Sequence, residues 1–116
     1  MIVTMQSSVS VGANATNSNV VSTQRYERAP FAAKGSMFST GSAAGLTAEL
    51  NVGGNSVTPP TIVNANNRVP LIPDDFFTEF EALAGQLIQV TVANTTAGAL
   101  TFFWKITLEE ADVVVG

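Results

Sequence analysis

Charged residues are scarce in this chain of 116 residues: Asp, Glu, Lys and Arg make up 12% of it, against about 25% in an ordinary soluble domain. Asn, Thr, Ser, Ala and Gly stand where charged side chains would usually be found. A free-standing soluble monomer usually keeps a mixed, charged surface. So few charges therefore indicate surfaces that are covered by other protein, on a chain of the size of one domain.

Histidine and cysteine are absent altogether. Their absence excludes a nucleophile that histidine activates, and also a thiol nucleophile. The adjacent carboxylates that remain are Asp74–Asp75 and Glu109–Glu110. Neighbours in a strand point to opposite faces, so Glu109 and Glu110 would not converge on one substrate, and Asp74 is better explained as a helix cap. The sequence therefore predicts no catalytic residue and a protein that is not an enzyme.

Patterns typical of a metal or cofactor site are also missing. Glu109, Glu110 and Asp112 could offer oxygen ligands to Ca²⁺, but the EF-hand spacing is absent and an exposed acidic rim is the better interpretation. The segment 35–45 holds three glycines without the spacing of a phosphate-binding loop. We therefore predict neither a metal nor a cofactor.

The few charges are unevenly spread. Residues 1–73 hold four basic and two acidic side chains, a net charge of +2, whereas residues 74–116 hold one basic and seven acidic ones, a net charge of −6. This asymmetry indicates either a solvated acidic end or two complementary surfaces that meet between subunits. The total of −4 argues against a general affinity for nucleic acid.

Long apolar runs are lacking as well. No stretch approaches the ~20 apolar residues of a membrane span, so no span is predicted. The N-terminal residues lack the basic and apolar regions of a signal peptide. We therefore expect a protein made in the cytoplasm and used without Sec export.

What the chain does have is alternation of apolar and polar residues. Leu46–Val52 alternates cleanly, and Gln86–Val92 and Thr101–Leu108 flank a turn at Asn94–Gly98. The face expected to lie inward in the last of these strands carries Phe102, Trp104, Ile106 and Leu108. Short strands with Gly, Pro and Asn turns predict an all-β, antiparallel sandwich, and a jelly roll is favoured over a partly open sandwich.

Two segments are open to more than one interpretation. For residues 74–83 we prefer a short helix, because Phe76, Phe80 and Leu83 would share one face, although a strand competes. A helix here would be the only one in the chain. Val113–Val115 could form a final edge strand.

The N-terminal residues 1–24 are polar and poor in large apolar side chains, so we interpret them as an extended arm ahead of a sandwich domain at 25–116. Val9 and Val11 alternate with serine, which is a weak strand signal. Such an arm would become ordered only where a partner or a sheet edge supplies contacts, because ordering costs ~1–2 kcal/mol per residue. Its removal is then expected to leave the sandwich folded.

The candidate interface combines this arm with exposed aromatic and basic residues. Phe103 shares a face with Lys105, so either that face is covered or Phe103 contacts a partner, which we favour. Two arginines around Tyr26 could stack on a base or clamp a phosphate, but an ion-paired patch with Glu27 is the commoner explanation. The predicted interface residues are Val9, Val11, Arg25, Tyr26, Arg28, Phe103 and Lys105.

Across residues 45–110 the chain resembles small single-domain virion proteins of bacteriophages, such as jelly-roll or β-sandwich minor capsid, penton and decoration subunits. The resemblance lies in the segments 45–54, 84–94 and 102–108 and in the polar N-terminal arm. It implies a structural subunit without cofactor, located in the virion, that binds itself and other virion proteins, and it assigns a role to no single residue. The alternative is a glycan-binding or adhesin sandwich that uses Phe103, Tyr26 and the Asn-rich loops.

Overall fold

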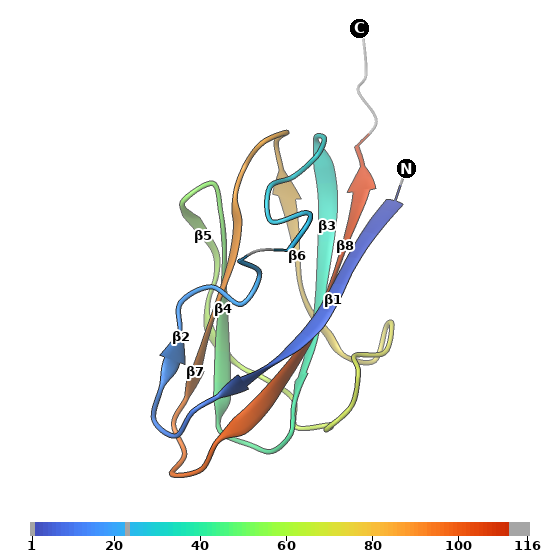
Figure 1. Ribbon diagram of the computed structural model, residues 1–116. Coiled ribbons are helices and arrows are strands. Elements are labelled where there is room, and N and C mark those ends of the chain that lie inside the picture. The colour runs from blue at the N-terminus through green and yellow to red at the C-terminus, as the bar shows by residue number, and fades with distance from the viewer. Residues whose placement is uncertain (1, 23, 112–116) are drawn as a thin grey trace, which may run out of the picture.

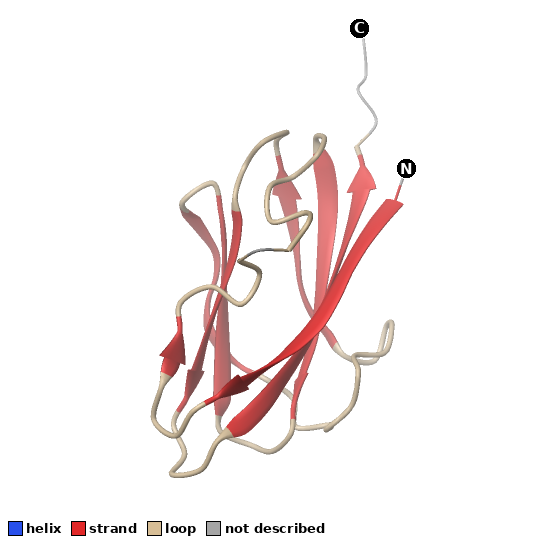
Figure 2. Ribbon diagram, in the orientation of Figure 1, coloured by secondary structure: helices blue, strands red, loops and turns tan. Residues whose placement is uncertain are grey.

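The computed structural model describes residues 2–22 and 24–111, which form two four-stranded antiparallel sheets packed face to face (Figures 1 and 2). One sheet has the strand order β1-β8-β3-β6 and the other β2-β7-β4-β5. No described residue is helical (Figure 2). The predicted all-β antiparallel sandwich is confirmed. The strands are β1 (Ile2–Val11), β2 (Thr16–Asn17), β3 (Ala33–Gly41), β4 (Leu46–Val52), β5 (Asn55–Ile62), β6 (Phe76–Ala82), β7 (Ile88–Asn94) and β8 (Leu100–Glu110).

Each strand of the first half of the chain pairs with one of the second half. β1 pairs with β8, β2 with β7, β3 with β6 and β4 with β5, always antiparallel. The turn at the centre of this arrangement is Gly53–Gly54, whose φ angles of 59° and 84° suit glycine. As a result, β1 begins beside the end of β8, although they are about as far apart in sequence as two strands can be (Figure 1).

The core lies between the inner faces of the two sheets. In β4, β7 and β8 every second side chain is buried, as the alternation predicted. Trp104 is fully buried. The other three residues predicted to share its inward face, Phe102, Ile106 and Leu108, are fully buried as well. Removal of this apolar surface from water is the main force that holds the sandwich together.

Residues 76–82 form the strand β6, so the preferred helix at 74–83 was wrong. β6 pairs with β3, and the ring of Phe80 lies directly against Gly35, where no side chain stands in the way. The helical face would have buried Phe76 and Leu83 with Phe80, yet Phe76 is 47% and Leu83 66% exposed. Packing against a distant glycine decided the structure here, and local periodicity did not.

The predicted N-terminal arm is also corrected, because β1 is an integral strand of the sandwich. Its register with β8 is unbroken from Ile2 opposite Glu109 to Val11 opposite Leu100. Val11 is 2% exposed, and Val9 is partly buried against the core, while the contact of either residue with a partner remains a prediction. The edge of the chain's own sheet supplies the contacts that order this polar segment.

Residues 19–22 and 24–29 continue along β7. The N–H of Val20 donates to the carbonyl of Val90, and the N–H of Ala29 donates to the carbonyl of Gln86. Val21 is fully buried. The sandwich therefore includes most of the segment that was predicted to precede it. The expected edge strand Val113–Val115 lies outside the described residues.

Candidate interaction site: the loop between β5 and β6

The loop at residues 63–75, between β5 and β6, is fastened to β3. The N–H of Gly41 donates to the carbonyl of Asn64, and the carbonyl of Gly41 accepts from the N–H of Asn67. At the end of the loop, the N–H of Ser39 donates to the carbonyl of Asp75. These hydrogen bonds fix both ends of a connection that contains no regular secondary structure.

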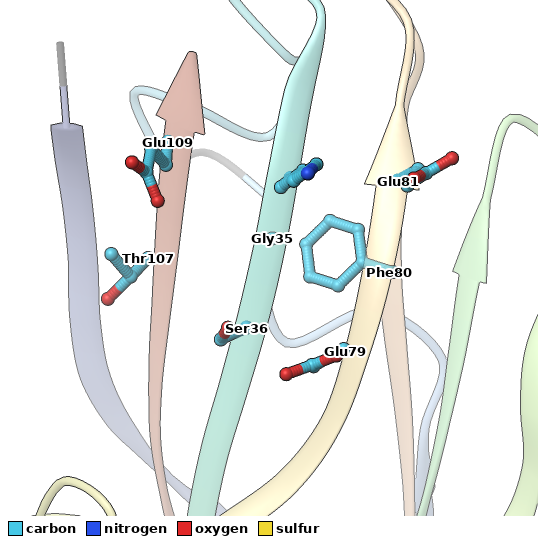
Figure 3. A pocket seen from close by; sticks show the side chains of 8 residues that line it. Gly35, Ser36, Glu79, Phe80, Glu81, Thr107 and Glu109 are labelled. Carbon is cyan, nitrogen blue, oxygen red and sulfur yellow. The ribbon is translucent and has the colours of Figure 1, made fainter. Parts of the chain in front are cut away.

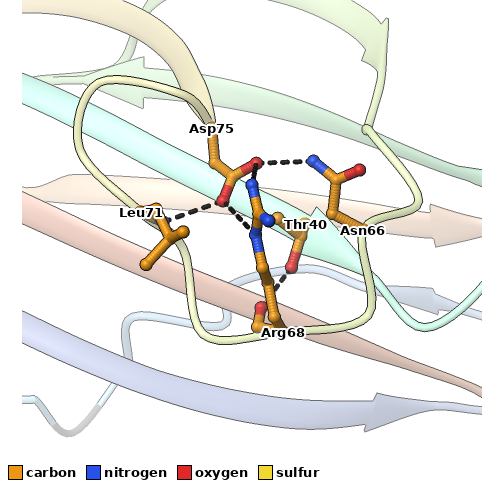
Figure 4. A network of polar contacts seen from close by, with 5 residues as sticks. All are labelled: Thr40, Asn66, Arg68, Leu71 and Asp75. Atoms are coloured by element: carbon orange, nitrogen blue, oxygen red, sulfur yellow. Dashed lines mark hydrogen bonds and ion pairs between the residues drawn. The ribbon is translucent and has the colours of Figure 1, made fainter.

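The side chain of Asp75 organises the middle of the loop (Figure 4). It is completely buried. Its Oδ1 accepts from Asn66 Nδ2 at 2.6 Å and from Arg68 Nη2 at 3.2 Å, and its Oδ2 accepts from Arg68 Nε at 3.1 Å and from the N–H of Leu71 at 2.8 Å. The two-pronged contact with Arg68 is the geometry in which guanidinium and carboxylate bind best. Thr40 on β3 adds a hydrogen bond to the carbonyl of Arg68.

Asp75 is held in its charged form. Burial raises the pKa of this carboxyl, but the hydrogen bonds from Arg68, Leu71 and Asn66, together with the charge of Arg68, lower the pKa further, and it lies below its ordinary value. The side chain of Arg68 is 41% exposed. The loop is therefore fastened around a buried negative charge, whose cationic partner is partly exposed to solvent.

Sequence reasoning missed this network. It assigned Asp74 to a helix cap and gave Asp75 no role beyond the helix, whereas Asp74 is exposed and Asp75 is buried. The partners of Asp75 come from positions 66, 68 and 71, and it is the irregular path of the loop that brings them to one carboxylate. Only the two prolines at 70 and 73, which indicate an extended and restricted chain, pointed to an unusual loop.

This fastened loop and the first residue of β6 display apolar side chains. Val69 is 48% exposed, Leu71 47%, Ile72 58% and Phe76 47%. We call these four residues the apolar loop; they are half of the eight exposed large hydrophobic side chains among the described residues. Phe76 is held edge-on against Phe38, with ring centroids 6.0 Å apart. Clustered exposed apolar side chains on an ordered backbone are typical of a protein–protein contact.

Phe103 lies beside this loop. It is half-buried and lines a hollow together with Val69 and Pro70 of the loop and Gln6–Ser8 of β1. Lys105 stands between Gln6 and Phe38 on the same outer face and is also half-buried. Val69 and Pro70 thus shield part of the Phe103 side chain from solvent within the same chain. Contact of Phe103 and Lys105 with a partner remains a prediction.

The predicted interface residues Arg25, Tyr26 and Arg28 do not form one binding surface. The guanidinium of Arg25 lies over the ring of Tyr26, 5.5 Å from its centroid, and Tyr26 itself packs against the core. Arg28 points elsewhere and donates from Nη1 to the carbonyl of Gly85. Tyr26 therefore has one face engaged by Arg25, which reduces its value as a platform for a base or a sugar.

A second hollow lies on the outer face of β8, β3 and β6 (Figure 3). Lys34 on β3 stands opposite Glu109 of β8 on one side and Glu81 of β6 on the other. Opposite charges at facing positions stabilise a sheet. At these facing positions, and in the ion pair of Arg68 with Asp75, basic residues of 1–73 lie opposite acidic residues of 74–116 within one chain.

No group of three or more potential metal ligands occurs among residues 2–22 and 24–111. Glu109 and Glu110 are both exposed at the end of β8, and Asp112 lies outside the described residues. In the same part of the chain, no helix has the length and apolar character needed to cross a membrane. The apolar loop is therefore the best-defined candidate for function.

Comparisons with known proteins assign no family. No family model matches the chain, no curated protein matches it, and no solved structure matches it. The functional conclusion must consequently be drawn from the fold and from the surface itself.

Asp75→Asn is expected to lower the free energy of unfolding at neutral pH by about 1–3 kcal/mol, because it removes the charge that Arg68 and Leu71 bind. Since the pKa of Asp75 is lowered in the folded state, the stabilisation is complete above the unfolded pKa of about 3.9 and is lost as the pH falls through the folded pKa. Urea denaturation from pH 7 to pH 2 measures both effects.

The control for this experiment is Asp74→Asn, at the exposed neighbouring carboxylate. It should leave stability nearly unchanged. If Asp75→Asn loses as much stability toward acid as the wild type does, then Asp75 is not the group whose protonation loosens the loop.

Proposed function

We propose that this protein is a non-enzymatic structural subunit of a bacteriophage particle, which acts by packing against copies of itself and against neighbouring virion proteins. The fold supports the proposal. Two packed four-stranded antiparallel sheets are compatible with the jelly roll that we expected from the sequence, an architecture that viral capsid proteins use. Since one fold serves many functions, the fold agrees with this proposal but does not establish it by itself.

The observation that carries the proposal is the apolar loop. Its four large side chains remain in water unless another molecule covers them, while the buried carboxylate of Asp75 keeps the loop from collapsing onto the sheet. Complete burial of a fully exposed side chain of this kind contributes roughly 1.5–3 kcal/mol, so covering the exposed half of each would contribute roughly half of that amount. A neighbouring protein subunit with its own apolar surface is the occupant that matches this chemistry.

The scarcity of charge supports the same conclusion. At 12% charged residues, a large part of the surface offers no electrostatic barrier to close packing. A subunit of this kind would be made in the host cytoplasm and would end in the virion. A glycan-binding module has less support, because Tyr26 and Phe103 are both partly covered within the chain.

Replacing Leu71 and Ile72 together by serine is expected to shift the protein toward smaller species and to weaken association roughly tenfold or more. The matched control is Leu83→Ser, a side chain that is 66% exposed in the turn after β6 and lies outside the apolar loop. Light scattering over a concentration series gives the mass of each variant. If the loop variant and the control associate like the wild type, the apolar loop is not the contact, and the proposal loses the observation that carries it.

A further inference from the structure

The four edges of the two sheets are not equally protected. Natural proteins shield an exposed strand edge with proline, charge, a bulge or a covering segment. β5 carries Pro59 and Pro60. β6 carries Glu79 and Glu81, and its pairing with β3 contains an irregularity. The edge beyond β7 is occupied by β2 and by hydrogen-bonded residues of the segments 19–22 and 24–29.

β1 has none of these devices. Its ten residues include no charged residue and no proline, and its register with β8 contains no bulge. On its other side, no strand of the described residues pairs with it. In an antiparallel strand every second residue directs its N–H and C=O away from the partner, so β1 presents a row of backbone groups. One hydrogen bond from a side chain of another strand reaches this backbone: Asn94 Nδ2 donates to the carbonyl of Val11, near the end of β1.

We propose that β1 pairs antiparallel with β1 of a second copy of this chain, so that two four-stranded sheets join into one of eight strands. A two-fold contact places the same strand opposite itself. A charged edge strand would repel its copy at such a contact, and β1 is uncharged. The lack of charge that leaves this edge unprotected is also what makes it compatible with itself.

The register of this contact follows from the geometry of the sheet. Facing residues must lie on the same face, so a residue with an even number must face another even one. Because the carbonyl of Val11 is already bound, the free edge runs from Ile2 to Ser10, and its centre is Gln6. The two-fold axis then passes through Gln6. On the inner side Val3 would face Val9 of the copy, and on the outer side Thr4 would face Ser8.

A second observation lies at the same place. A hollow of about 230 Å³ is lined by Gln6, Ser7 and Ser8 of β1 together with Val69 and Pro70 of the loop. A strand laid against β1 would bring its outer side chains beside this hollow. Val69 of both copies would then flank the axis, so the edge contact and the apolar loop form one continuous surface. The inference deepens the proposed function by naming the contact between copies, and it rests on that function only in requiring self-association.

The absence of cysteine makes a selective crosslink possible. In the pairing centred on Gln6, the two Cα atoms of residue 6 lie about 4.5–5.5 Å apart, within the ~4.4–6.8 Å that a disulfide spans. Gln6→Cys, oxidised with copper phenanthroline, is expected to give a covalent dimer of most of the protein. The matched control is Thr107→Cys on the same face of β8, one strand away from the edge. Equal and low yields for the two variants would overturn the proposal.

A charge exchange tests the same contact without crosslinking. Gln6→Lys and Gln6→Glu alone are each expected to weaken self-association roughly tenfold or more, because each places two like charges face to face. A 1:1 mixture should restore it, since lysine then faces glutamate. Circular dichroism checks that both variants fold.

The outcomes separate this inference from the proposed function. If association is lost in the variant with Leu71 and Ile72 replaced by serine, but Gln6→Lys associates like the wild type, the proposed function stands and the β1 contact is wrong. If Gln6→Lys is weakened and the mixture is not restored, the strands do not face each other at residue 6, and the proposed register is wrong. If the wild type does not associate at all, both proposals fall.

Discussion

Removal of residues 1–11 is expected to prevent the sandwich from folding. β1 contributes Met5 and Val11 to the core and covers the adjacent strand β8, whose inner face carries Trp104 and Ile106. Burying each such side chain contributes about 1.5–3 kcal/mol, while the whole net stability of a domain is only ~5–15 kcal/mol. The truncated chain should therefore lack near-ultraviolet circular dichroism and a cooperative unfolding transition.

A peptide supplies the control for this truncation. A synthetic peptide of residues 1–11, added in excess, should restore the native spectrum, because an added strand can complete a sheet in trans. A peptide of the same composition but without the alternation of valine and serine should not. A truncated protein that unfolds cooperatively without any peptide would show that β1 is a dispensable arm.

The substitution Trp104→Ala is expected to lower the free energy of unfolding by about 3–5 kcal/mol. Trp104 is fully buried between the two sheets, on the same face as Phe102 and Ile106. Removing the indole leaves a cavity that neighbours in two sheets cannot fill without distorting their strands. Urea denaturation followed by circular dichroism measures the change.

Phe103→Ala is the matched control, since the two residues are neighbours in β8 and point to opposite faces. Phe103 is half-buried, so its loss should cost about half as much or less. A second readout is the fluorescence of the wild type, in which the single tryptophan should resist quenching by iodide. Equal losses for both variants, or ready quenching, would mean that the inward face of β8 has been assigned incorrectly.

The strands that could be predicted from sequence are those in which local pattern and burial agree. β4, β7 and β8 alternate strictly, and the structure buries the predicted side chains. β8 lies inside its sheet between β1 and β3, so its alternation reflects one face on the core and one face on the outside. The alternation of apolar and polar residues then corresponds directly to the alternation of buried and outward-facing side chains.

The elements that could not be predicted depend on partners far away in the chain. β1 looked like a polar arm because its strand partner β8 starts near residue 100. β6 looked helical because the space for Phe80 is provided by Gly35, on a strand about 40 residues earlier. In both cases a contact at long range outweighed local preference, which is weak in strands.

The candidate site was hidden for a similar reason. The apolar residues of the loop are visible in the sequence between residues 69 and 76, but their exposure follows from the buried carboxylate of Asp75 and its partners. No local pattern distinguishes a buried aspartate in a loop from an exposed one. The alternation of Val9 and Val11 with serine indicated a strand, but it did not reveal which sheet edge this strand would join.

The mass of the native full-length protein in solution tests the central claim, that this chain is an assembling structural subunit, most directly. Light scattering from micromolar to millimolar concentration should give a mass of at least twice the 12.1 kDa of one chain. The mass should fall toward one chain when the apolar loop or Gln6 is substituted as described. A wild-type protein that keeps the mass of a single chain over the whole range would contradict the account.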